Sequence, residues 1–329
     1  MKIGLRLPSY GEHCTYERVI GNSRWIEEAG FNSVWVRDQL SFHPHAFEGR
    51  GTNILEPFTT LAAIAALTKQ LKLGTSTVVT YRHPLVTSAL FGTLAYISKG
   101  RIIPGIGAGN ERSAFAAVGL PFEKRGKIVE EMLQILRLTW RQDHVSFHGE
   151  FYNFDHMTID PKPPADTPLF YGGTSKYAVQ RAVKYCDGWL PSRIPFKVLD
   201  RFISFLRELE EKEKKQKRMM INYSVLGSID KDSARAWKRV GVQEMIENQA
   251  RLIRENKWEG VSAATKEDLD GVLVAGSPQE FVDQLFRFQE RGIEEILLEF
   301  RTTFDEWEKT LDLLAAEVLP HFKEDGMGG

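Results

Sequence analysis

The chain has 329 residues, of which 42% are hydrophobic and 26% are charged. This is the composition of an ordinary globular enzyme, and the length suits one large α/β barrel or two smaller domains. The net charge of −1 gives no reason to expect a nucleic-acid partner or an anionic membrane surface. No apolar run reaches membrane-spanning length. The two cysteines, Cys14 and Cys186, are too few for a disulfide framework and favour a reducing, cytoplasmic setting.

Short apolar segments alternate with helical ones along the whole chain. Segments rich in β-branched and aromatic residues predict strands at 2–8, 32–37, 71–79, 101–106, 169–171, 187–190, 219–227 and 293–300. Helical spacing predicts helices at 16–29, 56–69, 85–98, 121–141, after 175, and at 197–215, 277–291 and 306–322. Eight strands that each precede a helix are typical of a parallel barrel. We therefore expect an α/β fold, a single (β/α)8 TIM barrel domain over residues 1–329.

Two insertions interrupt this alternation. Residues 144–164 follow the fourth helix, and their sequence HVSFHGEFYNF predicts a hairpin that turns at His148-Gly149. Residues 233–270 follow the seventh strand and are helical, polar and long, which predicts an inserted lid or an oligomer contact. The loop at 39–53 is also long for a connection from strand to helix, and such loops usually carry function.

In a (β/α)8 barrel the chemistry lies at the carboxyl ends of the strands, where two glycine-rich turns are predicted. The turn at 172–175 offers backbone N–H groups, two hydroxyls and the positive end of a helix. These groups suit a phosphate, although a tight turn with a helix cap is the alternative. Gly105, Gly107 and Gly109 alternate after the fourth strand. They would let a flat ring lie against the backbone, or relieve a crowded barrel mouth.

The sequence offers little for metal or nucleophilic catalysis. His43-Pro44-His45 has the spacing of a metal pair, but no companion ligands follow later strands, so no metal site is expected. No nucleophile elbow and no Ser/His/Asp order is present. A bound cofactor is therefore expected to carry the chemistry, and a phosphorylated flavin-type coenzyme suits the two turns.

Six segments, in order, make the chain similar to the bacterial luciferase-like family of flavin-dependent oxidoreductases, which includes coenzyme F420-dependent members. They are AGFNSVWVRDQL (29–40), LGTSTVV with RHP (73–84), ISKGRIIPGIGAGN (97–110), VGLPFEKRGKIVEEMLQILRLTW (118–140), PLFYGGTSKYAVQRAVKYCDGW (168–189) and GSPQEFVDQLFRFQERGI (276–293). The resemblance implies a (β/α)8 barrel that binds FMN or F420 at its carboxyl face.

The resemblance also assigns residues to the site. It implies a non-proline cis peptide between Ser76 and Thr77, under the central ring of the coenzyme. It places Asp38 near the ring and the substrate. With His43 and Glu111, which follow the second and fourth strands, Asp38 makes up the set of candidate catalytic residues. His83 and Arg193 are further candidates for proton transfer or substrate binding. The implied cofactor-binding residues are Asp38, Ser76, Thr77, Gly107, Ala108, Gly109, Asn110, Gly172, Gly173, Thr174 and Ser175.

Two departures from the family pattern leave the cofactor and substrate open. Gln39 stands where many F420-using members have a histidine. Asn110 stands where sugar-phosphate dehydrogenases of the family carry a glutamate as proton donor, and Glu111 comes one residue later. A sugar-phosphate activity is therefore not favoured.

The leading hypothesis is a monooxygenase that receives reduced FMN from a separate reductase and acts on a small organic substrate. The first alternative is F420-dependent hydride transfer without oxygen. A non-catalytic flavin-binding protein and a metal-dependent hydrolase using His43 and His45 are more distant alternatives. A homodimer is expected, with the Ala-rich and weakly charged second and third helices as contact faces.

Overall fold

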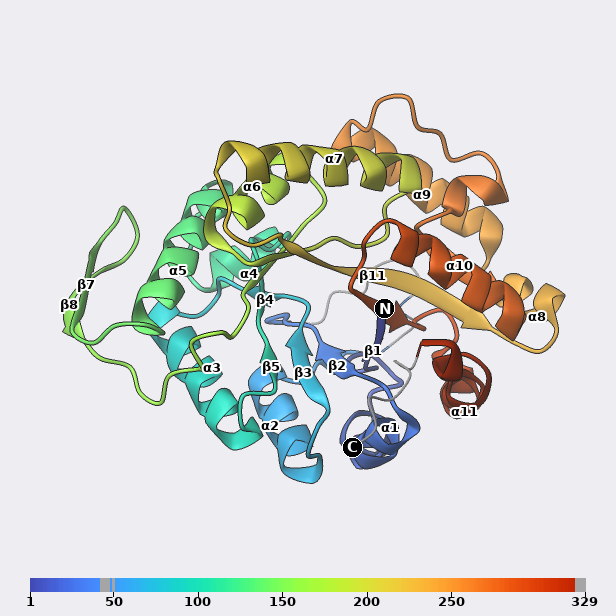
Figure 1. The fold of residues 1–329 in the computed structure, drawn as a ribbon, viewed down its shortest axis with the longest axis horizontal. Coiled ribbons are helices and arrows are strands. Elements are labelled where there is room, and N and C mark those ends of the chain that lie inside the picture. Colours follow the sequence, from blue (N-terminus) through green and yellow to red (C-terminus); the bar gives the residue numbers. More distant parts are fainter. Residues whose placement is uncertain (42–47, 49–50, 323–329) are drawn as a thin grey trace.

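The computed structural model describes residues 1–41, 48 and 51–322. A single sheet of parallel strands forms its centre, and helices surround it (Figure 1). The strands of this sheet are β1 (Lys2–Arg6), β2 (Ser33–Val36), β3 (Lys72–Thr75), β4 (Val78–Val79), β5 (Ile102–Ile103), β6 (Gly105–Gly107), β9 (Phe170–Gly172), β10 (Gly188–Leu190), β11 (Met220–Ile229), β12 (Leu273–Gly276) and β13 (Glu295–Glu299).

The order of neighbouring strands closes this sheet into a barrel. The path of hydrogen-bonded neighbours runs β4-β6-β9-β10-β11-β13-β1-β2-β3-β5. Its two ends meet, because β4 continues β3 after two residues and β6 continues β5 after one. The third and fourth barrel strands are thus each broken in the middle. Their first halves, β3 and β5, pair in parallel, and so do their second halves, β4 and β6. The predicted (β/α)8 TIM barrel is confirmed.

The helices follow the strands as predicted, with two local differences. They are α1 (Ser23–Ala29), α2 (Pro57–Leu67), α3 (Pro84–Ser98), α4 (Arg112–Ala117), α5 (Arg125–Thr139), α6 (Lys176–Tyr185), α7 (Phe196–Lys212), α8 (Ser233–Arg239), α9 (Val242–Asn256), α10 (Pro278–Glu290) and α11 (Trp307–Glu317). A separate π-helical turn, Glu17–Gly21, precedes α1, so the first predicted helix is split. The short helix α4 was not predicted.

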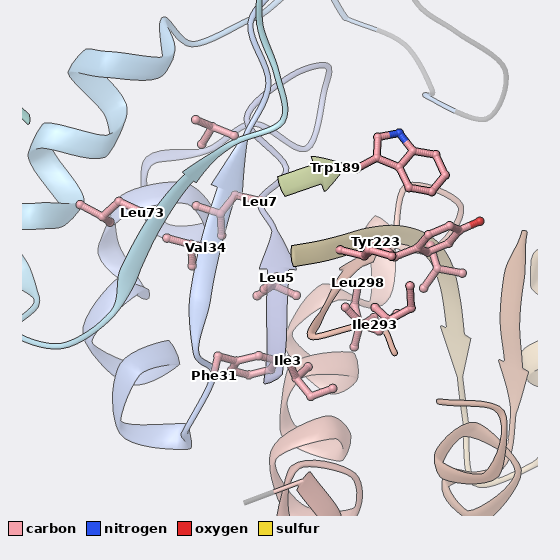
Figure 2. Close-up of a cluster of buried hydrophobic side chains, with 14 of the residues drawn as sticks. Ile3, Leu5, Leu7, Phe31, Val34, Leu73, Trp189, Tyr223, Ile293 and Leu298 are labelled. Carbon is pink, nitrogen blue, oxygen red and sulfur yellow. The ribbon is translucent and has the colours of Figure 1, made fainter. Parts of the chain in front are cut away.

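Apolar side chains pack on both faces of the barrel wall. A large cluster joins the strands to the surrounding helices, and Figure 2 shows its part around Leu5, Val34, Leu73 and Tyr223. A smaller cluster, which includes Trp35, joins residues of six barrel strands. A Cβ at Gly74 would collide with the Trp35 ring, so this glycine makes room for the indole. The barrel interior is therefore a packed core rather than a pore.

The two insertions add structure outside the barrel. The first is an antiparallel hairpin of β7 (Val145–His148) and β8 (Asn153–Met157), which projects beside α5 (Figure 1). The second contains α8 and α9, and the strand that follows it, β12, pairs with the carboxyl half of β11. These elements share an apolar cluster, so most of the second insertion is a packed extension of the sheet. The strand β12 was not predicted.

Glu27 ties the first helix to the start of the third strand. Its carboxylate on α1 accepts hydrogen bonds from the backbone N–H groups of Lys69, Gln70 and Leu71, at 2.5–3.1 Å. Burial alone would raise the pKa of Glu27, but these three donors and the nearby charge of Arg101 outweigh it and lower that pKa. A carboxylate with a lowered pKa stabilises the fold above its unfolded pKa, and this contribution is lost as the pH falls.

We predict that Glu27→Gln lowers the free energy of unfolding by about 1–2 kcal/mol at pH 7, because charged acceptors make stronger hydrogen bonds and this site is half exposed. The difference from wild type should shrink as the pH falls below 4.5, the ordinary pKa of a glutamate. Urea unfolding of both proteins at pH 7 and at about pH 3.5 measures this difference in the free energy of unfolding. Glu28→Gln, an exposed neighbour on the same helix, is the matched control. A pH-independent loss would contradict the assignment.

Candidate active site

A cavity of about 730 Å³ opens at the carboxyl ends of the strands. The predicted cofactor-binding residues all line it: Asp38, Ser76, Thr77, Gly107, Ala108, Gly109, Asn110, Gly172, Gly173, Thr174 and Ser175. They come from four separate stretches of sequence, so the fold gathers them in one place. Their roles in coenzyme binding remain predictions.

The peptide bond between Ser76 and Thr77 is cis, as the family resemblance implied. It separates β3 from β4 and places the Thr77 side chain between two glycines of neighbouring strands. A Cβ at Gly107 would collide with Thr77 Oγ1, and a Cβ at Gly172 would collide with Thr77 Cγ2. Gly107 and Gly172 therefore make room for the Thr77 side chain at the barrel mouth. We call this side of the cavity, formed by Thr77, Gly107 and Gly172, the glycine half.

Positively charged groups stand beside the turn at 172–175. Ser175 begins α6, where its Oγ accepts a hydrogen bond from the Ala178 N–H at 3.2 Å. Arg181, one turn into this helix, and Arg125 of α5 line the same end of the cavity. A Cβ at Gly126 would lie 2.5 Å from Arg181 Nη2, so this glycine lets the guanidinium pass close to α5. A helix amino terminus with two guanidinium groups is a favourable place for a phosphate.

Asp38 lies at the end of β2 with its carboxylate already engaged. Its Oδ2 accepts hydrogen bonds from the Val79 N–H at 3.0 Å and from Arg82 Nη1 at 2.6 Å, and its Oδ1 accepts from Arg82 Nη2 at 3.1 Å. The side chain is buried. Asp38 therefore holds the end of β2 against β4, in addition to lining the cavity.

Four arginines line the other side of the cavity, which we call the arginine half: Arg6, Arg37, Arg193 and Arg301. Arg6 Nη1 donates to Glu299 at 3.1 Å, and Arg301 donates to both Glu299 and Glu48. Burial would raise the pKa of Glu299, but the charges of Arg301, Arg6 and Arg193 outweigh it and hold that pKa well below its usual range.

Tyr10 and Arg37 complete this network. Tyr10 donates its hydroxyl to Glu299 at 3.0 Å, and burial raises the pKa of Tyr10 to about 12, so the hydroxyl keeps its proton. Arg37 pairs with Glu48 at 2.6 Å and stacks over the Tyr10 ring at 3.7 Å from its centroid. The arginine half is thus a connected layer of buried charges.

The other predicted catalytic residues are placed differently. His43 lies outside the described residues. Glu111 caps α4 by accepting hydrogen bonds from the Ser113 N–H and hydroxyl, and His83 caps α3 through the Leu85 N–H. Neither Glu111 nor His83 lines the cavity, and no histidine does so in the part of the chain that the structure describes. Their catalytic roles remain predictions.

Several residues that line the cavity were not predicted from the sequence. Arg181 could have been predicted, because it lies four residues after Tyr177 and therefore on the same face of the helix that follows the glycine turn. Arg125 and Gly126 come from a helix whose first turn faces α6, which only the packing shows. Asn256 ends α9, so the tip of the second insertion reaches the cavity, as a lid would.

None of the described helices has the length and apolarity needed to span a bilayer. Among the described residues, no group of three or more His, Cys, Asp or Glu side chains could hold a metal ion.

A parallel barrel with a large cavity at the carboxyl ends of its strands has the architecture of the barrel enzymes, whose active sites lie at that face. The chain belongs to the luciferase-like monooxygenase family, whose model matches residues 5–295. This family contains oxidoreductases that include F420-dependent dehydrogenases.

One sequence relative and two solved structures illustrate the range of this family. An F420-dependent glucose-6-phosphate dehydrogenase of Nakamurella multipartita is 26% identical over 319 residues, which is 90% of each chain. An F420-dependent secondary alcohol dehydrogenase, solved with an F420-acetone adduct, has a TM-score of 0.79 at 19% identity and covers 98% of this chain and 99% of its own. The oxygenating part of the 3,6-diketocamphane monooxygenase of Pseudomonas putida, with FMN, has a TM-score of 0.77 at 18% identity, covering 97% and 98%. The two structures establish the fold alone.

We predict that Gly172→Ala and Gly107→Ala each lower the free energy of unfolding by about 1–3 kcal/mol, because the added Cβ collides with Thr77. Thr77→Ser removes Cγ2 and keeps the hydroxyl oxygen. It should therefore rescue Gly172→Ala and leave Gly107→Ala destabilised. Urea unfolding of the single and double variants measures this coupling. Equal rescue of both glycine variants would show that the Thr77 side chain is not wedged as described.

Proposed function

We propose that this chain is an oxidoreductase that binds a flavin-type coenzyme across the cavity and acts on a small organic substrate. The observation that carries the proposal is the convergence of residues 76–77, 107–110 and 172–175 on one cavity of about 730 Å³. That volume is in the range of cofactor sites. The matching family model and the F420-dependent and FMN-containing relatives support it.

The residues present fit such a coenzyme. Ser175, the first turn of α6, Arg125 and Arg181 would hold its phosphate. The Oε1 atom of Gln39 is buried in the cavity wall and has no hydrogen-bond partner among the described residues, so it can accept a hydrogen bond from a ring N–H. When bound, FMN or F420 supplies the electron pair or hydride, which none of the lining side chains can supply.

The chain's own residues would position the reactants. Arg6 Nη2 donates to the Ser76 carbonyl at 3.2 Å, which fixes the backbone beside the cis bond. Asp38 fixes the neighbouring strand end through the Val79 N–H. The arginine half provides guanidinium donors for a polar group of the substrate. Such fixed donors need little rearrangement when a substrate binds.

The first candidate reaction is monooxygenation with reduced FMN from a separate reductase. It is supported by the description of the matching family as luciferase-like monooxygenases and by the FMN-containing oxygenase with the same fold. The chain has no GxGxxG fingerprint for a nicotinamide coenzyme, which fits reduction of the flavin by another protein.

The second candidate is F420-dependent hydride transfer without oxygen. It is supported by the F420-dependent relative that spans 90% of this chain at 26% identity. A sugar phosphate is not the favoured substrate, because Asn110 follows the glycines and the neighbouring Glu111 caps α4. Both candidates place the coenzyme in the same cavity.

We predict that the purified chain binds either FMN or F420 and shifts its absorbance spectrum. Arg181→Met should weaken this binding about tenfold or more, because one charged contact to the phosphate is lost. Glu130→Gln removes the ion-pair partner of Arg181 but keeps the guanidinium, so it is the matched control and should leave binding within about twofold. Binding of neither coenzyme would refute the proposal. Oxygen uptake with reduced FMN separates the two candidate reactions.

We propose a homodimer that uses the faces of α2 and α3. These two packed helices contain no charged residue, and Val86, Tyr96 and Ile97 of α3 are 51%, 76% and 44% exposed. Exposed apolar patches of this kind mark contact surfaces.

We predict that Tyr96→Glu lowers the mass in solution from that of a dimer to that of a monomer, as measured by sedimentation. Tyr16→Glu, at a tyrosine that is 64% exposed elsewhere, should leave the mass unchanged. A monomeric wild type would rule out the homodimer.

A further inference from the structure

The two halves of the cavity come from different strands of the barrel. The glycine half is formed at β4, β6 and β9, which are neighbours in the sheet. The arginines come from the remaining part of the barrel, which begins at β10 beside β9: Arg193 follows β10, Arg301 follows β13, Arg6 ends β1 and Arg37 follows β2. A coenzyme that lies against the glycine half would therefore leave the guanidinium groups of the arginine half facing the rest of the cavity. This placement makes the arginine half the wall that faces a substrate.

Three of the four arginines have carboxylate partners and one does not. Arg6, Arg37 and Arg301 share Glu48 and Glu299. The guanidinium of Arg193 makes no hydrogen bond or ion pair with any described residue, although it lines the cavity. The residues at 42–47 and 49–50 contain no aspartate or glutamate in sequence, so they supply no carboxylate either. Four cations against two anions leave this half of the cavity with excess positive charge.

The backbone fixes Arg193 in place. Its φ of 50° is in the left-handed region, which is uncommon for a residue with a side chain and recurs at functional sites. The Arg193 N–H donates to the Ser224 carbonyl at 3.0 Å. The backbone of the next residue is also fixed, because the Ile194 N–H donates to the buried Tyr223 hydroxyl at 2.7 Å. The unpaired guanidinium is thus presented from a rigid loop.

We propose that Arg193 binds the carboxylate of a small organic acid, which is the substrate class of this enzyme. The assignment rests on the proposed function, because it takes the coenzyme to occupy the glycine half. A guanidinium matches a carboxylate with two parallel hydrogen bonds. Burial, and then the charge of Arg301, lower the pKa of Arg193 to about 10, so Arg193 is still charged at pH 7. A bound carboxylate supplies the missing negative charge.

The test compares benzoate with its neutral isostere benzamide, by calorimetry on the whole chain with and without bound coenzyme. The wild type should bind benzoate at least about tenfold more tightly than benzamide, since a charged hydrogen-bonded contact is worth that much. Arg193→Met should remove this preference and leave benzamide binding unchanged. Arg201→Met makes the same charge change on an exposed residue outside the cavity and should keep the preference.

Arg193→Lys is the second variant. It keeps the positive charge, so it tests the inference even if Arg193→Met fails to fold. It should lose at least about threefold in benzoate affinity, because an ammonium lacks the planar fork.

Equal binding of benzoate and benzamide by the wild type would overturn the inference even where a coenzyme binds. A loss of FMN or F420 binding as large as the loss of benzoate binding would overturn it too, because Arg193 would then serve the coenzyme. Benzoate selectivity that depends on Arg193, in a chain that binds neither coenzyme, would support the carboxylate site and refute the proposed function.

Discussion

The mouth of the barrel depends on one buried carboxylate. Glu299 ends β13 and accepts hydrogen bonds from Arg6 of β1, from Arg301 and from the Tyr10 hydroxyl. Arg6 also reaches the Ser76 carbonyl, so a single ion network ties the eighth and first strands to the cis peptide of the third. Removing such a carboxylate would leave buried guanidinium groups unpaired, which is far costlier than the net stability that the pair provides. The network is therefore a constraint on shape more than a source of stability.

That constraint, together with the position of Thr77, gives the cavity two unlike walls. Thr77 fits between two glycines, so the third, fourth and fifth strands approach closely and present mostly backbone to the cavity. On the other wall, long guanidinium side chains extend over buried carboxylates. A flat uncharged ring suits the first wall, and a polar or anionic molecule suits the second. The proposed positions of the coenzyme and the substrate thus rest on side-chain size and charge along the order of the strands.

The barrel was predictable from sequence because its signals are local: short β-branched runs, helical spacing, and glycine at the turns. The cis peptide followed from family resemblance alone. The strand β12 was missed because four apolar residues after a polar helical stretch carry no strand signal of their own; their partner is the extended second half of β11. Glu111 looked catalytic because it follows the glycines, but there the chain turns into α4 and its carboxylate caps that helix. Contacts between elements, such as Arg181 against Gly126, are set by packing and leave no pattern in either segment.

Relatives with different named chemistries share this barrel, so the fold alone does not select a reaction. The glycine half is built from backbone and small side chains, and backbone contacts to a ring and a phosphate do not distinguish one flavin-type coenzyme from another. Selection must then come from side chains that reach the cavity from elsewhere. In this chain those include Gln39, whose Oε1 atom has no described partner, and the arginine half with its unpaired Arg193. A neutral substrate that displaces water from the cavity would leave the excess positive charge of the arginine half uncompensated, whereas an anionic substrate would neutralise part of it. Charge is therefore the first criterion for choosing among candidate substrates.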